Sequence, residues 1–283
     1  MKKILAILVA LAMVFAFAAC GKDDKDDTAT EGTTVNIDAE MEELLNNDPV
    51  EPATEVITNV DADGNVVTEV ITEAAPAGFN STDPAEVAAF YVAASNKTRD
   101  DGKEPAGQQK MVLKGEITGE GAIGTILKFL NPAVASALEK NSTATDYIPG
   151  ASRGDLQASD ISECVAKTDA NGNTTLFIKL KSQTDGSDCD GHEAGPVARG
   201  IGTLGSIDGA LEELGAELIS GRDTVSLKYT DAYIKCVVNS DGYIVSGTWH
   251  YLVNVHIGDA QAKLGIKANL KNLKAAIDYT VTI

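Results

Sequence analysis

The chain has 283 residues, with 42 acidic and 23 basic side chains and a net charge of −19 at pH 7. The acidity is concentrated in residues 21–80, which hold 16 acidic residues and two lysines. Residues 81–283 are only mildly acidic and are numerous enough to bury a core of their own. No basic patch with interleaved aromatic residues is present, so we expect no nucleic-acid partner.

Residues 1–20 have the pattern of an export signal. Two lysines precede an uncharged apolar run that ends in small residues, as in a signal peptide. The final Phe17-Ala-Ala-Cys20 resembles the lipobox of Gram-positive bacterial lipoproteins, although that family more often has leucine where Phe17 stands. The resemblance implies that Cys20 is lipidated and anchors the protein to the outer face of the cytoplasmic membrane through two acyl chains. A retained N-terminal helix or plain secretion is the alternative.

Residues 21–80 predict an acidic, disordered linker, because low hydrophobicity with charge of one sign cannot offset the entropy of ordering. Within the linker, 39–46 has a helical pattern of one or two turns, which is marginal alone. The string TEVIT occurs at 54–58 and again at 68–72, which indicates two weak strands around a turn.

A calcium loop is the alternative interpretation of the acidic turn at Asp61-Ala-Asp63-Gly-Asn. An EF-hand loop needs glycine at its sixth position and glutamate at its twelfth. Counted from Asp61, these positions hold Val66 and Thr72, so the spacing does not fit and we favour the turn.

A folded domain is predicted over 81–283, and Asp83, Pro84 and Glu86 give it a strong helix start. The remaining elements follow from apolar periodicity and turn residues. In chain order we predict a helix over 83–96, a strand over 111–118, two short helices within 123–138 with Asn131 capping the second, an irregular loop over 141–160, a hairpin of strands 161–168 and 174–182, a loop over 183–199, and a helix over 206–218.

The helix predicted over 206–218 has the clearest amphipathic pattern. Its apolar side chains recur at alternating spacings of three and four, at Leu204, Ile207, Leu211, Leu214 and Leu218. The stripe is too short for a coiled coil, so we expect it to pack on the sheet.

The stretch 224–283 predicts an antiparallel meander of three long strands. The apolar parity slips near Thr230 and again near Lys271, which indicates bulges, and Ser240-Asp-Gly marks a hairpin turn. The middle strand is expected to turn one apolar face inward, namely Val245, Trp249, Tyr251, Val253, Val255 and Ile257. Long bulged strands bend, so we predict an α+β fold: a curved, half-barrel-like antiparallel sheet with helices on its concave face.

Two strings match catalytic or nucleotide-binding motifs without their context. The G-x-S-x-G at 150–154 lacks the strand and helix of a nucleophile elbow, and the G-x-G-x-x-G at 200–205 lacks a parallel βαβ unit. We therefore predict that the protein is not an enzyme and needs no cofactor.

Metal binding and disulfide formation are also weakly supported. Cys189 and His192 form a C-x-x-H half-site without two further zinc ligands, so we expect no metal. Cys236 lies in the apolar phase of its strand and predicts a buried free thiol, which leaves Cys164 and Cys189 as the pair to test. His250 and His256 lie on the polar side of one strand and are expected to face solvent.

Two functions remain open for this anchored domain. The predicted architecture resembles half-barrel lipid carriers and, less closely, tubular lipid-binding folds, which implies a lipid or other hydrophobic ligand held between sheet and helices. The residues expected to line such a cavity are Leu211, Leu214, Leu218, Trp249, Tyr251, Val253 and Ile277. The alternative is a structural or protein-interaction lipoprotein whose core is filled. The oligomeric state stays open.

Overall fold

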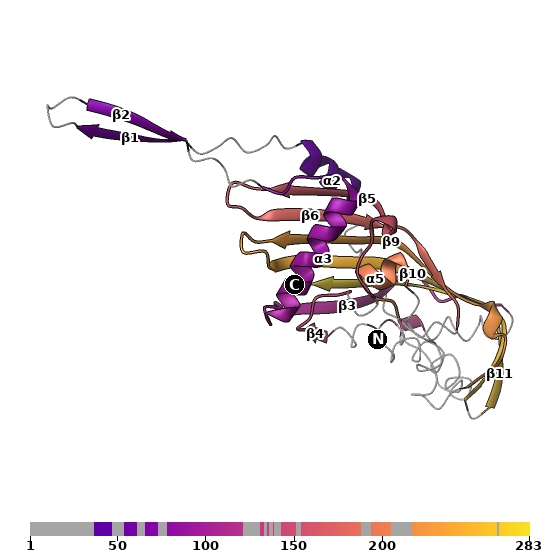
Figure 1. Ribbon diagram of the computed structural model, residues 1–283. Coiled ribbons are helices and arrows are strands. Elements are labelled where there is room, and N and C mark those ends of the chain that lie inside the picture. Colours follow the sequence, from indigo (N-terminus) through magenta and orange to yellow (C-terminus); the bar gives the residue numbers. More distant parts are fainter. Residues whose placement is uncertain are drawn as a thin grey trace.

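A computed structural model describes a large part of the chain (Figure 1). The described residues are 37–46, 54–60, 66–72, 78–120, 131, 132, 135, 138, 143–150, 154–187, 194–204, 217–264 and 266–283. The signal sequence, Cys20 and most of the segment 121–142 lie outside them.

An antiparallel sheet of nine strands forms the body of the described structure, in the order β4-β3-β11-β10-β9-β6-β5 (Figure 1). Two short strands lie off this path, where β7 pairs with β9 and β8 pairs with β10. The strands are β3 (Gly107–Leu113), β4 (Thr143–Thr145), β5 (Ile161–Thr168), β6 (Thr174–Leu180), β7 (Gln183–Asp185), β8 (Glu217–Ser220), β9 (Val225–Val238), β10 (Ile244–Leu264) and β11 (Ile266–Thr282). The predicted meander and its antiparallel pairing are confirmed.

The hairpin turns follow the sequence signals. Strands β5 and β6 pair from Thr168 opposite Thr174, around a turn in which Gly172 has a positive φ of 80°. Gly242, with φ of 85°, closes the turn between β9 and β10, where its N–H donates to the Asn239 carbonyl. Glycine carries no Cβ and so takes this left-handed conformation without steric cost.

The bulge predicted near Thr230 is present. The register of β9 against β10 shifts between the pairs His250↔Tyr233 and Leu252↔Thr230, so β9 holds an extra residue there. Asp231 takes up the shift with φ of 52°. One inserted residue exchanges the two faces of a strand, and for that reason Tyr229 lies in the core while Tyr233 lies on the other side.

The prediction that Val245 faces inward is wrong. Its side chain is 46% exposed, whereas its neighbour Ile244 is 1% exposed. A second register shift lies between Ile244 and Ser246, so Val245 is an unpaired extra residue at the start of β10. The other residues predicted for this face, from Trp249 to Ile257, are buried as expected.

The parity slip predicted near Lys271 occurs at Asn272, where φ is 46°. Leu270 and Leu273 are both buried, so the inward face of β11 changes parity between them. The partner strand changes with it, because Ile257 and Ala260 are also both buried. The register of β10 against β11 is the same on either side of Asn272. Both strands therefore exchange their inward and outward faces at the same point.

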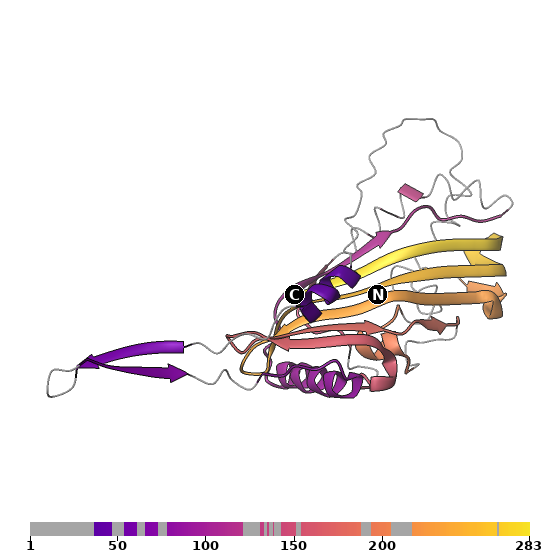
Figure 2. The same cartoon turned by 90° about the horizontal axis from the view of Figure 1, so that it is seen from above.

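Helix α3 (Pro84–Asp100) packs on one side of the sheet and runs four residues beyond the predicted end. Asp83 caps it by accepting hydrogen bonds from the N–H groups of Ala85 and Glu86, as predicted. We call the side that carries Trp249 and is covered by α3 the inner face. Helix α2 (Ile37–Asn46) lies on the opposite, outer face (Figure 2).

The segment predicted as a linker contains one helix and two strands in its described part. Besides α2 it holds strands β1 (Thr54–Val60) and β2 (Val66–Thr72), which form a separate two-stranded antiparallel sheet. Their pairing agrees with the turn predicted between the two TEVIT strings.

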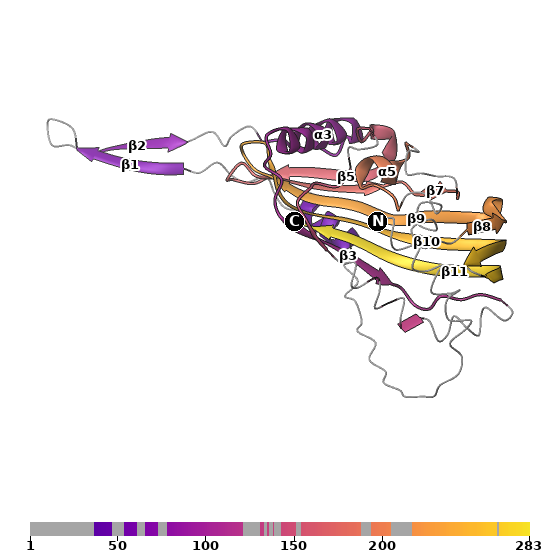
Figure 3. The same cartoon turned by 90° about the horizontal axis from the view of Figure 1, so that it is seen from below.

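Two predicted loops contain short elements. The loop 141–160 includes β4 and a 3₁₀ turn, Ala158–Asp160, while the loop 183–199 includes β7 and the start of helix α5 (Pro196–Gly200). A buried ion pair joins these regions, because the Arg199 guanidinium donates to both carboxylate oxygens of Asp160, with an Nε–Oδ2 distance of 2.6 Å. The 3₁₀ turn contacts α3, and α5 contacts this turn together with β6 and β9 (Figure 3).

Candidate functional site

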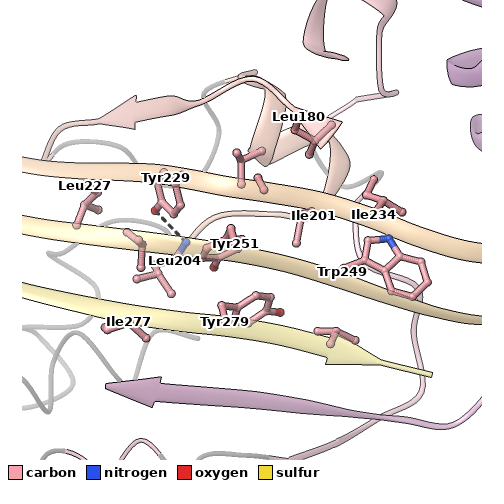
Figure 4. Packing of buried hydrophobic residues seen from close by; sticks show 14 of the residues in the cluster. Leu180, Ile201, Leu204, Leu227, Tyr229, Ile234, Trp249, Tyr251, Ile277 and Tyr279 are labelled. Atoms are coloured by element: carbon pink, nitrogen blue, oxygen red, sulfur yellow. Dashed lines mark hydrogen bonds between the residues drawn. The ribbon is translucent and has the colours of Figure 1, made fainter. Parts of the chain in front are cut away.

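The four described residues of the predicted ligand cavity lie side by side on the inner face. Trp249, Tyr251 and Val253 alternate along β10, and Ile277 of β11 is directly opposite Val253. All four side chains have 0% exposure and belong to one hydrophobic cluster (Figure 4). The prediction thus grouped residues that do come together, although they meet as packed core.

Tyrosine rings fill the middle of this cluster. The ring of Tyr251 stacks on that of Tyr279 with centroids 4.6 Å apart, and it meets the edge of Tyr229 at 5.2 Å. Such pairs contribute about 0.5–1.5 kcal/mol beyond their buried area. The chain entering from α5 covers them, since the N–H of Leu204 donates to the Tyr229 hydroxyl at 3.2 Å (Figure 4).

The prediction that Leu218 ends an amphipathic helix is wrong. Residues Glu217–Ser220 form strand β8, which pairs with β10 at Gln261–Lys263, beyond the pair that Ile257 makes with Val225, the first residue of β9. Leu218 is 5% exposed and joins the core from this strand. Leu211 and Leu214 lie outside the described residues.

Among the described residues, six buried side-chain polar atoms have no hydrogen-bond partner, and they include the hydroxyls of Tyr251 and Thr203 and one carboxylate oxygen of Asp185. Each such atom costs about 1–3 kcal/mol of stability. Burial raises the pKa of Tyr251 well above its ordinary value, with smaller contributions from Tyr279 and Tyr229. Its hydroxyl is therefore a neutral and uncompensated group.

The outer face carries a second, smaller apolar cluster. Val165 of β5, Phe177 of β6 and Tyr233 of β9 lie in one patch, and Met41 of α2 is packed on them and is 8% exposed. Phe177 and Tyr233 stack with ring centroids 5.7 Å apart. Burying a methionine side chain contributes about 1.5–3 kcal/mol, so Met41, with the partly buried Leu44, anchors α2 to the sheet.

Three lysines surround this patch and meet α2 at both ends. Lys179 pairs with Asp38 and Lys235 pairs with Glu40 near the start of the helix. Lys167 donates to the carbonyl oxygen of Leu45 in the last turn, at 3.1 Å. Cations at a helix C-terminus and acids in its first turn both agree with the helix dipole. These partly exposed pairs add about 0–1 kcal/mol each and set the orientation of the helix.

The pKa of Lys179 is raised, first by its hydrogen bond to Asp38 and then by the one to Glu163. Its ammonium group lies 2.8 Å from the Glu163 carboxylate. Lys179 therefore stays positively charged over the whole physiological range and holds two carboxylates, one from the sheet and one from α2.

A cleft of about 460 Å³ lies between α2, the start of α3 and the edge strand β5. Met41, Leu45 and Pro84 form part of its apolar wall, and Glu163 and Lys179 contribute charged groups. Residues 79–81 cover β5 beyond this point, where Ser81 pairs with Ala166. The cleft is thus the open portion of the sheet edge beside α2.

Cys164 also lines this cleft and carries a free thiol. The Sγ atom donates to the Thr82 carbonyl at 3.5 Å, so the pairing with Cys189 considered from the sequence is not formed. Burial, with a smaller effect of Asp83, raises the pKa of Cys164 to about 11. The thiol is therefore protonated and unreactive at neutral pH. The buried free thiol predicted at Cys236 is confirmed.

The two histidines of β10 lie on the outer face, as predicted, but they are not free in solvent. His250 has a side chain 16% exposed, and its Nδ1 lies 3.1 Å from the Thr280 hydroxyl and 3.3 Å from Asp278. Burial lowers its pKa, and Asp278 partly offsets the shift. His256 bonds to Asn272 at 3.0 Å.

Within the described residues, the remaining motifs do not assemble a chemical site. In the G-x-G-x-x-G string, Gly200 ends α5 and Gly202 follows it with φ of 96°, while Gly205 lies outside the described residues. Ser152, Cys189 and His192 lie outside the described residues. Among the residues that are described, no group of three His, Cys, Asp or Glu side chains is placed to hold a metal ion.

Comparison with known protein families, with curated proteins and with solved structures finds no match. In the part of the chain that the structure describes, no helix is both long enough and apolar enough to cross a membrane.

Proposed function

We propose that the protein is a lipid-anchored, extracytoplasmic interaction module with a filled core. The observation that carries this proposal is the packing of Trp249, Tyr251, Val253 and Ile277, which leaves no exposed surface on any of them. A hydrophobic carrier needs its apolar lining to be accessible to the ligand. Here the corresponding side chains pack in one cluster and Trp249 donates to Tyr91 of α3, and so they support the interaction role over the carrier role.

The proposal includes a sheet that curves toward α3, so that the inner face is the concave one. The bulge at Asp231 and the change of face at Asn272 support this curvature, because both increase the local twist of long strands. The surfaces that remain available to partners are then the outer face of the sheet and the sheet edge at β5.

Lipidation of Cys20 is the part of the proposal that places the module at the membrane. The lipobox resemblance supports it, and two acyl chains would make the attachment stable. Expression of the full chain with a labelled fatty acid tests it. We expect label on the unmodified chain and on Cys164→Ser, and none on Cys20→Ser. Label retained on Cys20→Ser would contradict the anchor.

Native mass spectrometry of the full chain, purified from lipid-containing cells, tests the filled core. We expect the mass of the lipidated protein alone. A further lipid that stays bound, and that is lost on Val253→Trp substitution in the core, would favour a ligand carrier and overturn the interaction role.

A further inference from the structure

The surface under α2 has the features of a binding site for a helix. We call it the α2 groove: Val165, Phe177 and Tyr233 form its apolar floor, and Lys167, Lys179 and Lys235 stand around it. These residues come from three adjacent strands, β5, β6 and β9, and lie on the outer face.

The strand register arranges the groove as a continuous patch. Val165 is opposite Phe177, which is opposite Lys235, so one row across the sheet holds two apolar residues and a cation. In a second row Lys179 is opposite Tyr233. Without α2 these apolar residues would form an exposed patch with lysines at its rim, and such patches are typical of interaction surfaces.

Helix α2 fills the groove only in part. The cleft of about 460 Å³ remains between it and β5, and the side chain of Leu45 at its end stays 46% exposed. The helix has ten residues, and in its last turn the Leu45 carbonyl accepts a hydrogen bond from Lys167. A helix with a larger apolar side chain toward the cleft would bury more surface there.

We propose that the α2 groove binds an acidic amphipathic helix of a partner protein, and that α2 occupies the groove in cis until the partner replaces it. The inference rests on the proposed interaction function and names the chemistry of the partner. Charge complementarity indicates the composition of this partner helix. It should carry carboxylates three positions and one position before an apolar residue, as Asp38 and Glu40 precede Met41 in α2.

Attachment in cis makes α2 a strong competitor. A segment on the same chain has an effective concentration of roughly millimolar for its own site, so a weak free peptide does not displace it. A partner succeeds by using the cleft that α2 leaves open, or when the groove has already been vacated. Occupancy of the α2 groove therefore depends on the affinity of the partner helix relative to that of α2.

A labelled peptide of residues 36–47 serves as the probe, with binding to the full chain followed by fluorescence anisotropy. We expect binding at least tenfold tighter to Met41→Asp, in which the apolar contact of α2 is lost, than to the unmodified chain. Glu43→Lys is the matched control, because it changes a charge on the exposed side of α2, and it should behave as the unmodified chain does.

Two further measurements keep the inference open to contradiction. When Lys179→Glu and Lys235→Glu are added to Met41→Asp, the chain should bind the peptide at least tenfold more weakly than Met41→Asp alone does. A peptide carrying phenylalanine in place of Glu42, which lines the cleft, should bind at least threefold tighter than the original. Hydrogen exchange of α2 in each variant reports whether the groove has been vacated.

The proposal is overturned if Met41→Asp exposes α2 to exchange and still binds no peptide, or if charge reversal of the lysines leaves binding unchanged. Failure of the broader interaction role appears separately, as retained lipid in the native mass spectrum. The two results are therefore independent.

Discussion

The indole Nε1 of Trp249 donates a 2.9 Å hydrogen bond to the hydroxyl oxygen of Tyr91, inside the core between β10 and α3. Both side chains are buried, so the indole N–H cannot donate to solvent water if the hydroxyl is removed. This bond fixes the helix against the middle of the sheet in a way that apolar contact alone does not.

Tyr91→Phe should lower the free energy of unfolding by about 1–3 kcal/mol, because it leaves the buried Trp249 N–H unpaired. Urea denaturation followed by tryptophan fluorescence measures the change. Tyr243→Phe removes the same atom from a hydrogen bond to Asp101 at the surface, so its effect should stay below about 0.5 kcal/mol. Equal losses in the two variants would argue against the special role of the buried bond.

Local signals explain what could be read from the sequence. A turn glycine or a slip in apolar parity can be recognised from a few consecutive residues, and so the bulge at Asp231 and the hairpin at Gly242 were predictable. Val245 was not, because Ile244 beside it is equally apolar and the extra residue leaves no mark in the pattern. Leu218 has helical spacing from its neighbours, and only the unpaired length of β10 makes it a strand.

The α2 groove did leave a signal that was missed. Val165, Phe177 and Tyr233 have the parity opposite to the core residues of their strands, and a lysine of the same parity follows two residues later in each case. Three neighbouring strands with an apolar residue and a lysine on the outward side indicate a covered patch. Which segment covers it depends on contacts over more than a hundred residues, so periodicity gives no answer.

Two tyrosines of the core should respond in opposite directions to loss of the hydroxyl. Tyr251→Phe removes a buried oxygen that has no partner, so we expect the free energy of unfolding to rise by about 1 kcal/mol. Tyr279→Phe removes a donor to Gln109, 3.2 Å away, and should lower it by about 1 kcal/mol.

Chemical denaturation of both variants under one set of conditions makes the comparison, and the two rings are stacked neighbours of similar burial. A loss of stability in Tyr251→Phe would mean that its hydroxyl is satisfied within the core after all.

The left-handed residue of the β9 bulge should tolerate only some side chains. Asp231 has φ of 52°, a conformation that Asp and Asn adopt more readily than other residues with a side chain. Asp231→Asn should therefore change the free energy of unfolding by less than about 0.5 kcal/mol, whereas Asp231→Val should lower it by about 1–3 kcal/mol. Thermal and urea unfolding measure both. If valine is accepted as readily as asparagine, the bulge is not held in this conformation.

His250 should make stability depend on pH. Burial lowers its pKa below the ordinary value of 6.5, and the carboxylates of Asp278 and Asp231 offset this only in part. Tyr233 covers one side of its ring at 5.0 Å, and Lys114, paired with Asp278, opposes protonation. The unfolded chain therefore binds a proton more readily than the folded one does.

Because the pKa of His250 is lower in the folded chain than in the unfolded chain, its contribution to stability is fully present above pH 6.5. This contribution is lost as the pH falls toward the lower folded pKa. Urea denaturation at pH 7.5, 6.5 and 5.5 should show the unmodified chain losing more stability than His250→Gln, which keeps a polar side chain beside Thr280 but does not titrate. The decisive quantity is the difference between the two slopes. A steeper loss in the glutamine variant would mean that Asp278 outweighs burial and that protonated His250 stabilises the fold.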